Sequence, residues 1–318
     1  MEYLKEYIDT ISRAFTISRR TQYKDRGACV ICYNDNGSIR EINISSSLIT
    51  RFYHRGNKRD FCPLKMYVTV ITKKFKIDPT PSMQQGCYLE TMLLGEGADG
   101  HTVTDLPRHK VTGAKCVVQK YIDKQASIMW PMIKEQQGII VHKDGPYKNV
   151  QVRQKIKWKF NEYPDIEVNI YATADLISPI RGNGYEYDMA VLDVKGCGNV
   201  DSDYGEYGWS GDSLKYKDHF QLVLYHRVFD LPVGYLDFDW SKNIGYKDIP
   251  VNVNTNHPDK EKAMEARYRI KEMEETIRKT LVDIVSYEKS GWNAEPSTES
   301  CDKCPNYLCQ HYKKTTEI

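Results

Sequence analysis

The stretch YEYDMAVLDVKG, residues 185 to 196, gives the strongest indication of the fold. Its apolar and polar residues alternate, which predicts a β-strand whose successive side chains point to opposite faces. Asp193 and Lys195 therefore share one face, while Val194 points to the opposite, core side. Taken alone, this D-x-K triplet is typical of a partly exposed ion pair at the end of a strand.

A second acid precedes this strand. The strand candidate IEVNIYATADLIS carries Asp175 inside an otherwise apolar run. If the two strands pair, Asp175 and Asp193 can share one divalent cation, and hard carboxylate oxygens suit Mg²⁺ or Mn²⁺. Such a cation activates water and neutralises charge on a phosphoryl group, while Lys195 stabilises the transition state or positions the water.

Composition sets wide limits on the class of protein. The 318 residues include 45 Lys and Arg against 43 Asp and Glu, a formal net charge of +2, so a polyanion site must be a local patch. The N-terminal stretch MEYLKEYIDTISRAF has no apolar run typical of a signal peptide or a membrane span, and we expect a cytoplasmic protein. In a reducing compartment the 9 cysteines indicate metal binding rather than a disulfide framework.

The remaining periodicities predict helices on both sides of a mixed central sheet, which is an α/β or α+β arrangement. The expected helices cover residues 3–15, a segment capped by Ser46 or Ser47, a segment from Cys62-Pro63, and residues 82–94, 115–130, 213–231 and 258–288. The expected strands cover residues 27–33, 38–44, 138–144, 150–160, 166–178, 185–196 and 233–240. We expect residues 1–45 to form an N-terminal helix and a hairpin that turns at Asn34–Gly37, and residues 46–318 to form the main domain.

Three cysteines lie close together in ESCDKCPNYLCQHY, residues 299 to 312. Cys301, Cys304 and Cys309 make an incomplete tetrahedral site. His311 would complete a zinc site, although a single residue separates it from Cys309. The fourth ligand can also come from elsewhere in the chain.

Two other segments offer that ligand. Cys29 and Cys32 lie in a β-branched stretch, where residues three apart face opposite ways, and we expect them to be core residues. Cys62 precedes Pro63 at an expected helix start, where the helix dipole and free amides stabilise a thiolate. Spacing alone leaves these alternatives open.

Seven short segments occur in an order that resembles a known family. They are ISSSLI, FCPLKMY, GCYLE, ADLIS, LDVKG, QLVLY and CDKCPNYLC, spanning roughly residues 44 to 312. The chain resembles the RecB-type nucleases of the PD-(D/E)XK superfamily, in particular the iron-sulfur branch that includes the AddB nuclease domain and the CRISPR-adaptation exonucleases. Each segment alone is weak, but the seven in order are a strong match. The resemblance implies a restriction-endonuclease-like α/β core.

The resemblance also implies roles for single residues. Asp175 and Asp193 look like the metal-binding acids and Lys195 like the catalytic lysine. Gln221 and Tyr225, one helical turn apart, match the final segment beside the active site. Glu90 stands where many relatives have a histidine, as in the phage recombination exonucleases, where a glutamate is a metal ligand.

For the cysteines, the resemblance selects Cys62. CP-x-x-x-Y followed by a distant CxxC and one more cysteine is how these nucleases hold a 4Fe-4S cluster. We therefore expect Cys62, Cys301, Cys304 and Cys309 to bind such a cluster, with zinc as the alternative metal. The cluster would join the N-terminal and C-terminal parts of the fold.

Two further segments are candidates for DNA contacts. In residues 150–160 basic side chains alternate with mostly apolar ones. The basic face could contact the phosphates of a DNA backbone, or it could belong to an edge strand whose lysines prevent pairing with another sheet, and the pattern fits both equally well. The loop after residue 197 carries aromatic rings that suit stacking on unpaired bases. The basic residues are Arg153, Lys155, Lys157 and Lys159, and the aromatic ones are Tyr204, Tyr207 and Trp209.

The sequence thus predicts a Mg²⁺- or Mn²⁺-dependent DNA nuclease, expected to act as an exonuclease on single strands or DNA ends. A second hypothesis is a non-catalytic DNA-binding or adaptor subunit of a recombination or CRISPR-like complex, with the protein partners that such a complex brings. Nuclease-dead relatives usually lose an acid or the lysine, whereas Asp175, Asp193 and Lys195 are all present. High tyrosine and lysine content fits a phage-encoded member, for which the compartment would be the host cytoplasm.

Overall fold

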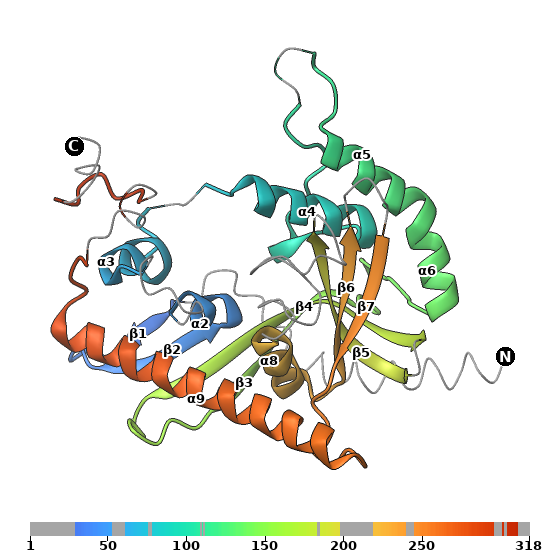
Figure 1. The fold of residues 1–318 in the computed structure, drawn as a ribbon. Coiled ribbons are helices and arrows are strands. Elements are labelled where there is room, and N and C mark those ends of the chain that lie inside the picture. The colour runs from blue at the N-terminus through green and yellow to red at the C-terminus, as the bar shows by residue number, and fades with distance from the viewer. Residues whose placement is uncertain are drawn as a thin grey trace. The chain divides into compact units, whose positions relative to one another are not determined.

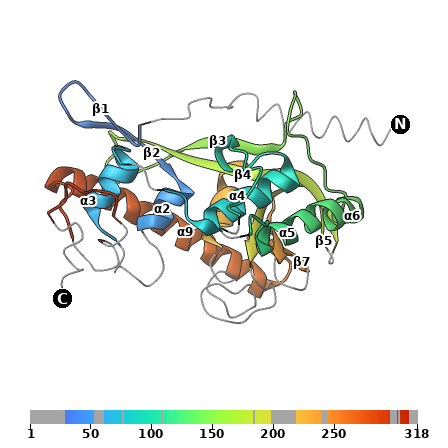
Figure 2. The ribbon, with the colours of Figure 1, turned by 90° about the horizontal axis from the view of Figure 1, so that it is seen from above.

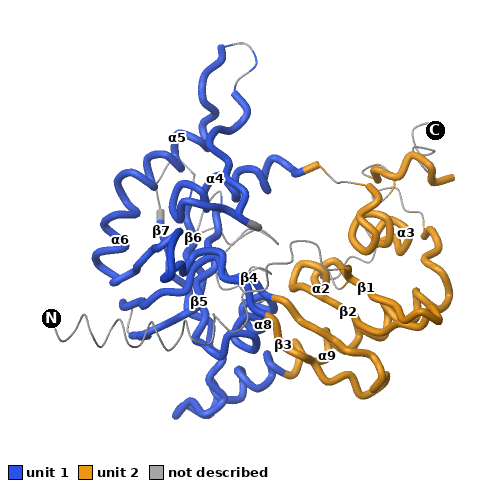
Figure 3. The backbone as a smooth tube through the Cα atoms, turned by 180° about the vertical axis from the view of Figure 1, so that it is seen from behind, with its two compact units in different colours: residues 1–23, 79–154, 172–270 blue, residues 24–78, 155–171, 271–318 orange. Residues whose placement is uncertain are grey.

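The computed structural model describes residues 29–52, 61–75, 78–108, 110, 112–182, 185–197, 219–239, 245–295, 301 and 304–310. The chain divides into two compact units, each made of three chain segments (Figure 3). Unit 1 comprises residues 1–23, 79–154 and 172–270, and unit 2 comprises residues 24–78, 155–171 and 271–318. The helix expected at residues 3–15 lies outside the described residues. The expected boundary at residue 45 stays a prediction.

Unit 1 is built on a mixed β-sheet (Figure 1). Its strands follow one another across the sheet in the order β4, β5, β6, β7. β5 is antiparallel to β4 and parallel to β6, and β7 is antiparallel to β6. The bounds are β4 (Glu167–Gly182), of which residues 172 onward belong to unit 1, β5 (Tyr185–Cys197), β6 (Val233–Asp239) and β7 (Gly245–Val251).

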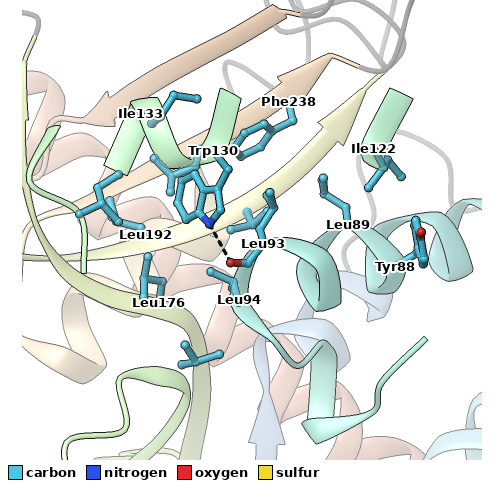
Figure 4. Packing of buried hydrophobic residues seen from close by; sticks show 14 of the residues in the cluster. Tyr88, Leu89, Leu93, Leu94, Ile122, Trp130, Ile133, Leu176, Leu192 and Phe238 are labelled. Atoms are coloured by element: carbon cyan, nitrogen blue, oxygen red, sulfur yellow. Dashed lines mark hydrogen bonds between the residues drawn. The ribbon is translucent and has the colours of Figure 1, made fainter. Parts of the chain in front are cut away.

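Helices complete unit 1, and the main hydrophobic core lies between several of them and the sheet. Leu192 of β5 and Phe238 of β6 pack in this core with apolar side chains from the helices between residues 81 and 137 (Figure 4). Val194 of β5 belongs to the same core. Trp130 is buried there, and its Nε1 donates a hydrogen bond to the Leu93 carbonyl oxygen at 2.7 Å. The helical elements are α4 (Pro81–Leu94), η3 (Ala98–Gly100), α5 (Val117–Lys124), the π-helical turn η4 (Gln125–Met129), α6 (Trp130–Gln137) and α8 (Phe220–Phe229). The predicted mixed sheet flanked by helices is therefore confirmed.

Unit 2 contains the predicted hairpin. β1 (Ile31–Tyr33) and β2 (Ile39–Ser45) pair antiparallel, and Gly37 adopts the left-handed conformation, φ 80°, that the tight turn requires. β2 also pairs in parallel with the first residues of β4. Ser45, rather than Ser46 or Ser47, caps the next helix, because its Oγ accepts a hydrogen bond from the Leu48 amide at 3.3 Å. The helical elements here are α2 (Ser46–Phe52), α3 (Pro63–Met66) and the π-helical turn η2 (Tyr67–Ile71).

The long helix α9 (Lys260–Ser290) matches the predicted amphipathic helix. Residues 271–290 belong to unit 2, and the apolar positions Met273, Ile277, Leu281 and Ile284 are buried. After the helix, Trp292 stacks on Tyr67 and Tyr287, with ring centroids 5.5 and 5.3 Å apart. Aromatic packing therefore brings the segment after α9 against the helical turn that follows α3.

Two strand predictions were wrong. Residues 138–144 form no strand, because two side chains take the hydrogen bonds that a neighbouring strand would have made. Asn149 accepts from the His142 amide at 2.6 Å and donates to the Ile140 carbonyl at 2.8 Å, and the Ser178 Oγ accepts from the Ile140 amide at 2.8 Å. Conversely, no strand was predicted at residues 245–251, which form β7, a strand that contains Pro250. It is the last strand of its sheet, where a proline is tolerated.

The predicted strand at residues 150–160 is β3 (Val150–Trp158), which pairs with β4. Of the helix expected at residues 213–231, the structure describes α8, and residues 213–218 lie outside the described part. No helix among the described residues is both long and apolar enough to span a lipid bilayer.

Candidate active site

The two aspartates predicted to share a site lie on neighbouring strands of unit 1. β4 and β5 are antiparallel with Leu176 opposite Leu192, so Asp175 and Asp193 follow as the next positions of the pairing. Asp175 is 8% exposed and Asp193 is 1% exposed. The Asp175 Oδ2 accepts a hydrogen bond from the Val194 amide at 2.9 Å, which fixes the Asp175 carboxylate against β5. The predicted convergence of these two acids is therefore present in the fold.

Lys195 lies beside Asp193 on the same face of β5, as period-two alternation predicts. Its Nζ is 2.5 Å from Asp193 Oδ2, and the lysine side chain is 33% exposed. Burial by itself lowers the pKa of Lys195, but the charges of Asp193 and Asp175 outweigh it and raise the pKa well above the ordinary lysine value. The ammonium therefore stays protonated at neutral pH, with one side toward the acids and one toward solvent.

Gln221 and Tyr225 come to the same acid from α8. The Gln221 Nε2 donates hydrogen bonds to Asp193 Oδ1 at 3.1 Å and to the Tyr225 hydroxyl oxygen at 2.6 Å. Burial raises the pKa of Tyr225, and the charges of Asp193 and Asp175 raise it further. Both oxygens of Asp193 thus have partners, and Tyr225 is a neutral phenol.

The third predicted acid, Glu90, lies on α4 of the same unit and is partly buried. It is connected to Asp175 by a residue that the sequence did not indicate. Gln151, on β3, donates its Nε2 to Asp175 Oδ1 at 3.1 Å and to Glu90 Oε2 at 3.5 Å. Its backbone φ is 49°, a left-handed conformation that glutamine rarely adopts, so no local pattern could have found it.

The acids are crowded enough to affect their protonation. Burial raises the pKa of Asp175 well above the ordinary value, and the negative charges of Asp193 and Glu90 raise it further. Lys195 and the Val194 amide oppose this rise in the pKa of Asp175. Hard carboxylate oxygens in a region short of positive charge match the needs of a divalent cation.

The four predicted cysteine ligands all belong to unit 2. Cys62 is the N-cap of α3 and Pro63 its first residue, as expected, and Cys62 and Cys301 are both buried. Burial raises the pKa of the Cys304 thiol; the Asn306 amide and Lys65 lower it, and the nearby thiols of Cys62 and Cys309 raise it. Cys62 therefore lies within electrostatic range of Cys304, and α3 and the C-terminal segment lie side by side in Figures 1 and 2.

Backbone hydrogen bonds form turns next to these cysteines. The Cys304 amide donates to the Cys301 carbonyl at 3.1 Å, and the Cys309 amide donates to the Asn306 carbonyl at 3.1 Å. Within the described part of the chain, however, no three or more His, Cys, Asp and Glu side chains are grouped as a metal site as they stand. His311, the local alternative ligand, lies outside the described residues.

Cys29 and Cys32 are not the core residues that were expected. Cys29 is exposed and precedes β1, so strand alternation does not separate the two thiols. The Cys32 Sγ lies 3.7 Å from the Cys29 carbonyl oxygen. Burial raises the pKa of Cys32, and the adjacent Cys29 raises it further, so these thiols are poor candidates for a stable thiolate pair.

The predicted DNA-contacting residues are only partly described. Lys157 is exposed and pairs with Glu167 at 3.0 Å, while the Lys155 Nζ lies 6.0 Å from the ring centroid of Tyr171. Arg153 is partly buried and Lys159 is exposed. The loop residues Tyr204, Tyr207 and Trp209 lie outside the described residues. DNA contact by these residues stays a prediction.

Comparison with known proteins finds no sequence relative and a distant structural likeness. No protein-family model matches the chain, and no curated protein matches its sequence. A crystal structure of the "Putative exonuclease" from Eubacterium rectale resembles this fold with a TM-score of 0.46 and 13% sequence identity, covering 82% of this chain and 86% of that one. The residues of the chain itself therefore carry the functional proposal.

Proposed function

We propose that this chain is a divalent-cation-dependent DNA nuclease that hydrolyses phosphodiester bonds, acting on single strands or free ends. The observation that carries the proposal is the ion pair between buried Asp193 and partly exposed Lys195, 2.5 Å apart, next to the second acid Asp175. A purely structural ion pair has no need of another buried acid beside it, because the extra negative charge destabilises the fold.

Carboxylates are the ligand type that a hard divalent cation takes, and Asp175 and Asp193 would hold it with Glu90 once their side chains move closer together, since no three of the described acidic side chains are grouped as a metal site as they stand. When bound, Mg²⁺ or Mn²⁺ would neutralise phosphate charge and lower the pKa of a water molecule. Lys195, which stays protonated, is suited to stabilise negative charge developing on the phosphate and is unsuited to accept a proton. Gln221 holds the Asp193 carboxylate through its 3.1 Å hydrogen bond, so that the acid keeps its orientation when substrate enters.

We further propose that Cys62, Cys301, Cys304 and Cys309 bind a 4Fe-4S cluster, with zinc as the alternative. Support comes from the all-thiol donor set and from the effect of Cys62 and Cys309 on the pKa of Cys304. The cluster would have a structural role, since it would join the first and last chain segments of unit 2.

The test is digestion of end-labelled DNA with Mn²⁺ or Mg²⁺ after anaerobic purification. Asp193→Asn and Lys195→Ala are expected to reduce cleavage at least ~100-fold, because each removes a charge that acts on the transition state. Asp188→Ala is the matched control, since Asp188 is an exposed aspartate on the same strand. Undiminished digestion by folded Asp193→Asn, checked by circular dichroism, contradicts the assignment.

A further inference from the structure

Gln151 is held in an unusual backbone conformation at the edge of the acid cluster. Its φ of 49° lies in the left-handed region, while its neighbours Val150 and Val152 are buried, 0% and 9% exposed. The buried neighbours anchor the strand on both sides of the residue, so the direction of the Gln151 side chain is set by this local backbone turn. The left-handed backbone places the neutral Gln151 side-chain amide between the carboxylates of Asp175 and Glu90.

The Gln151 amide is a hydrogen-bond donor between acids that come from different elements. Its Nε2 donates to Asp175 Oδ1 on β4 at 3.1 Å and to Glu90 Oε2 on α4 at 3.5 Å. The other oxygen of Asp175 is occupied by the Val194 amide. One NH₂ group therefore lies where a shared cation would bring these two carboxylates together.

We propose that Gln151 is an oxygen ligand of the divalent cation, and that its NH₂ group takes the place of the cation when none is bound. This inference rests on the proposed function. A carboxamide carries donors on one side and an acceptor on the other, and rotation about its last side-chain torsion exchanges them without moving the backbone. A cation held by Asp175 and Glu90 would repel the NH₂ group and attract the carbonyl oxygen, a ligand type that hard cations accept.

A neutral ligand suits this position because the negative charge is already high. Asp175 is 8% exposed, the buried Asp193 lies opposite it on β5, and Glu90 accepts from the same Gln151 amide, so another anion at position 151 would add repulsion in the cation-free protein. Glutamine adds an oxygen donor without that charge. It also keeps Glu90 and Asp175 together before the cation arrives, which reduces the reorganisation needed on binding.

The experiment measures Mn²⁺ binding to the full chain without DNA, by titration calorimetry and by the loss of the free Mn²⁺ electron paramagnetic resonance signal. Gln151→Met, which keeps the length but has no oxygen, is expected to weaken Mn²⁺ binding at least tenfold. Gln151→Glu restores an oxygen and is expected to bind Mn²⁺ as tightly as the unchanged protein or more tightly. Gln151→Gly relaxes the left-handed backbone, and we expect weaker Mn²⁺ binding with an unfolding midpoint no lower than that of the unchanged chain.

The matched control is Gln137→Met. Gln137 also donates to a carboxylate, Asp248 Oδ2 at 3.3 Å, in the same unit but away from the acids, and Mn²⁺ affinity is expected to change less than twofold. Unchanged or tighter Mn²⁺ binding by Gln151→Met overturns the ligand role. If Asp193→Asn loses Mn²⁺ binding while Gln151→Met retains it, this inference alone fails; if the unchanged protein binds no Mn²⁺, the proposed function fails with it.

Discussion

Asp175 is the residue at which stability and the proposed chemistry conflict most directly. It is 8% exposed, and burial together with Asp193 and Glu90 raises its pKa well above 3.8. An acid whose pKa is raised by folding stabilises the folded state most at low pH, below the unfolded value. This contribution is lost as the pH rises through the folded pKa, so at neutral pH the charged form of Asp175 destabilises the cation-free protein.

We therefore expect Asp175→Asn to be more stable than the unchanged protein at pH 8 in the presence of a chelator. Asparagine stays neutral and can still accept the Val194 hydrogen bond. The expected gain in the free energy of unfolding is ~1–2 kcal/mol, and it should shrink as the pH falls toward 4. Urea denaturation at a series of pH values measures it. A gain that grows toward pH 4 would show that the sign of the pKa shift is wrong.

Some site residues could be predicted from local sequence patterns and others could not. Asp193 and Lys195 were placed on one face correctly, because strand alternation is a local rule that the residues themselves carry. Gln151 was missed, because a left-handed φ is usual for glycine and asparagine and gives no signal in glutamine. Its role arises only from two distant carboxylates, on α4 and β4.

At the scale of elements, hairpin, helix and strand patterns were predicted well where a local period or turn determined them. β1, β2 and the turn at Gly37 followed from alternation and from the Asn34–Gly37 turn. The failure at residues 138–144 has a tertiary cause, since the side chains of Asn149 and Ser178 bind that backbone. Side-chain to backbone bonds of this kind compete with a strand ladder and leave no periodic signal.

The Asn149 side chain accordingly holds the backbone of residues 140–142 in place by hydrogen bonds. Its side chain accepts from the His142 amide and donates to the carbonyl oxygens of Ile140 and Ile177, and the residue is 6% exposed. Asn149→Ala leaves these buried groups unpaired, and we expect a loss of about 3 kcal/mol in the free energy of unfolding. Asn293→Ala, at an exposed asparagine whose side chain donates to the Ser290 carbonyl oxygen at the end of α9 at 3.4 Å, should cost less than about 1 kcal/mol. Equal losses in the two variants would contradict this account.

At the scale of the whole molecule, unit 2 is assembled from chain segments that are far apart in sequence. Cys62 lies in the first of them, while Cys301, Cys304 and Cys309 lie in the last. Closing such long loops costs chain entropy, and a bound metal repays it because metal binding and folding are coupled. The proposed cluster would therefore contribute to the stability of this unit as a whole.

Cys62→Ser is expected to lose bound iron and sulfide and to lower the unfolding midpoint by several degrees, corresponding to ~2 kcal/mol or more. Cys116→Ser is the control: the Cys116 Sγ caps α5, accepting from the Gln119 amide at 3.4 Å, and serine caps at least as well. Elemental analysis and the visible spectrum report the metal. Full iron content in Cys62→Ser would exclude it as a ligand, and stoichiometric zinc without sulfide would replace the cluster by a zinc site.

The left-handed backbone at Gln151 has a consequence for how this chain would evolve under different pressures. A library randomised at position 151 and selected only for heat resistance should become enriched in glycine, which adopts that conformation without strain. The same library selected for DNA degradation in a host should keep glutamine or glutamate. The two enriched populations would diverge at this position. Sequencing them would distinguish the residue that gives the most stable fold from the residue that the proposed nuclease activity requires.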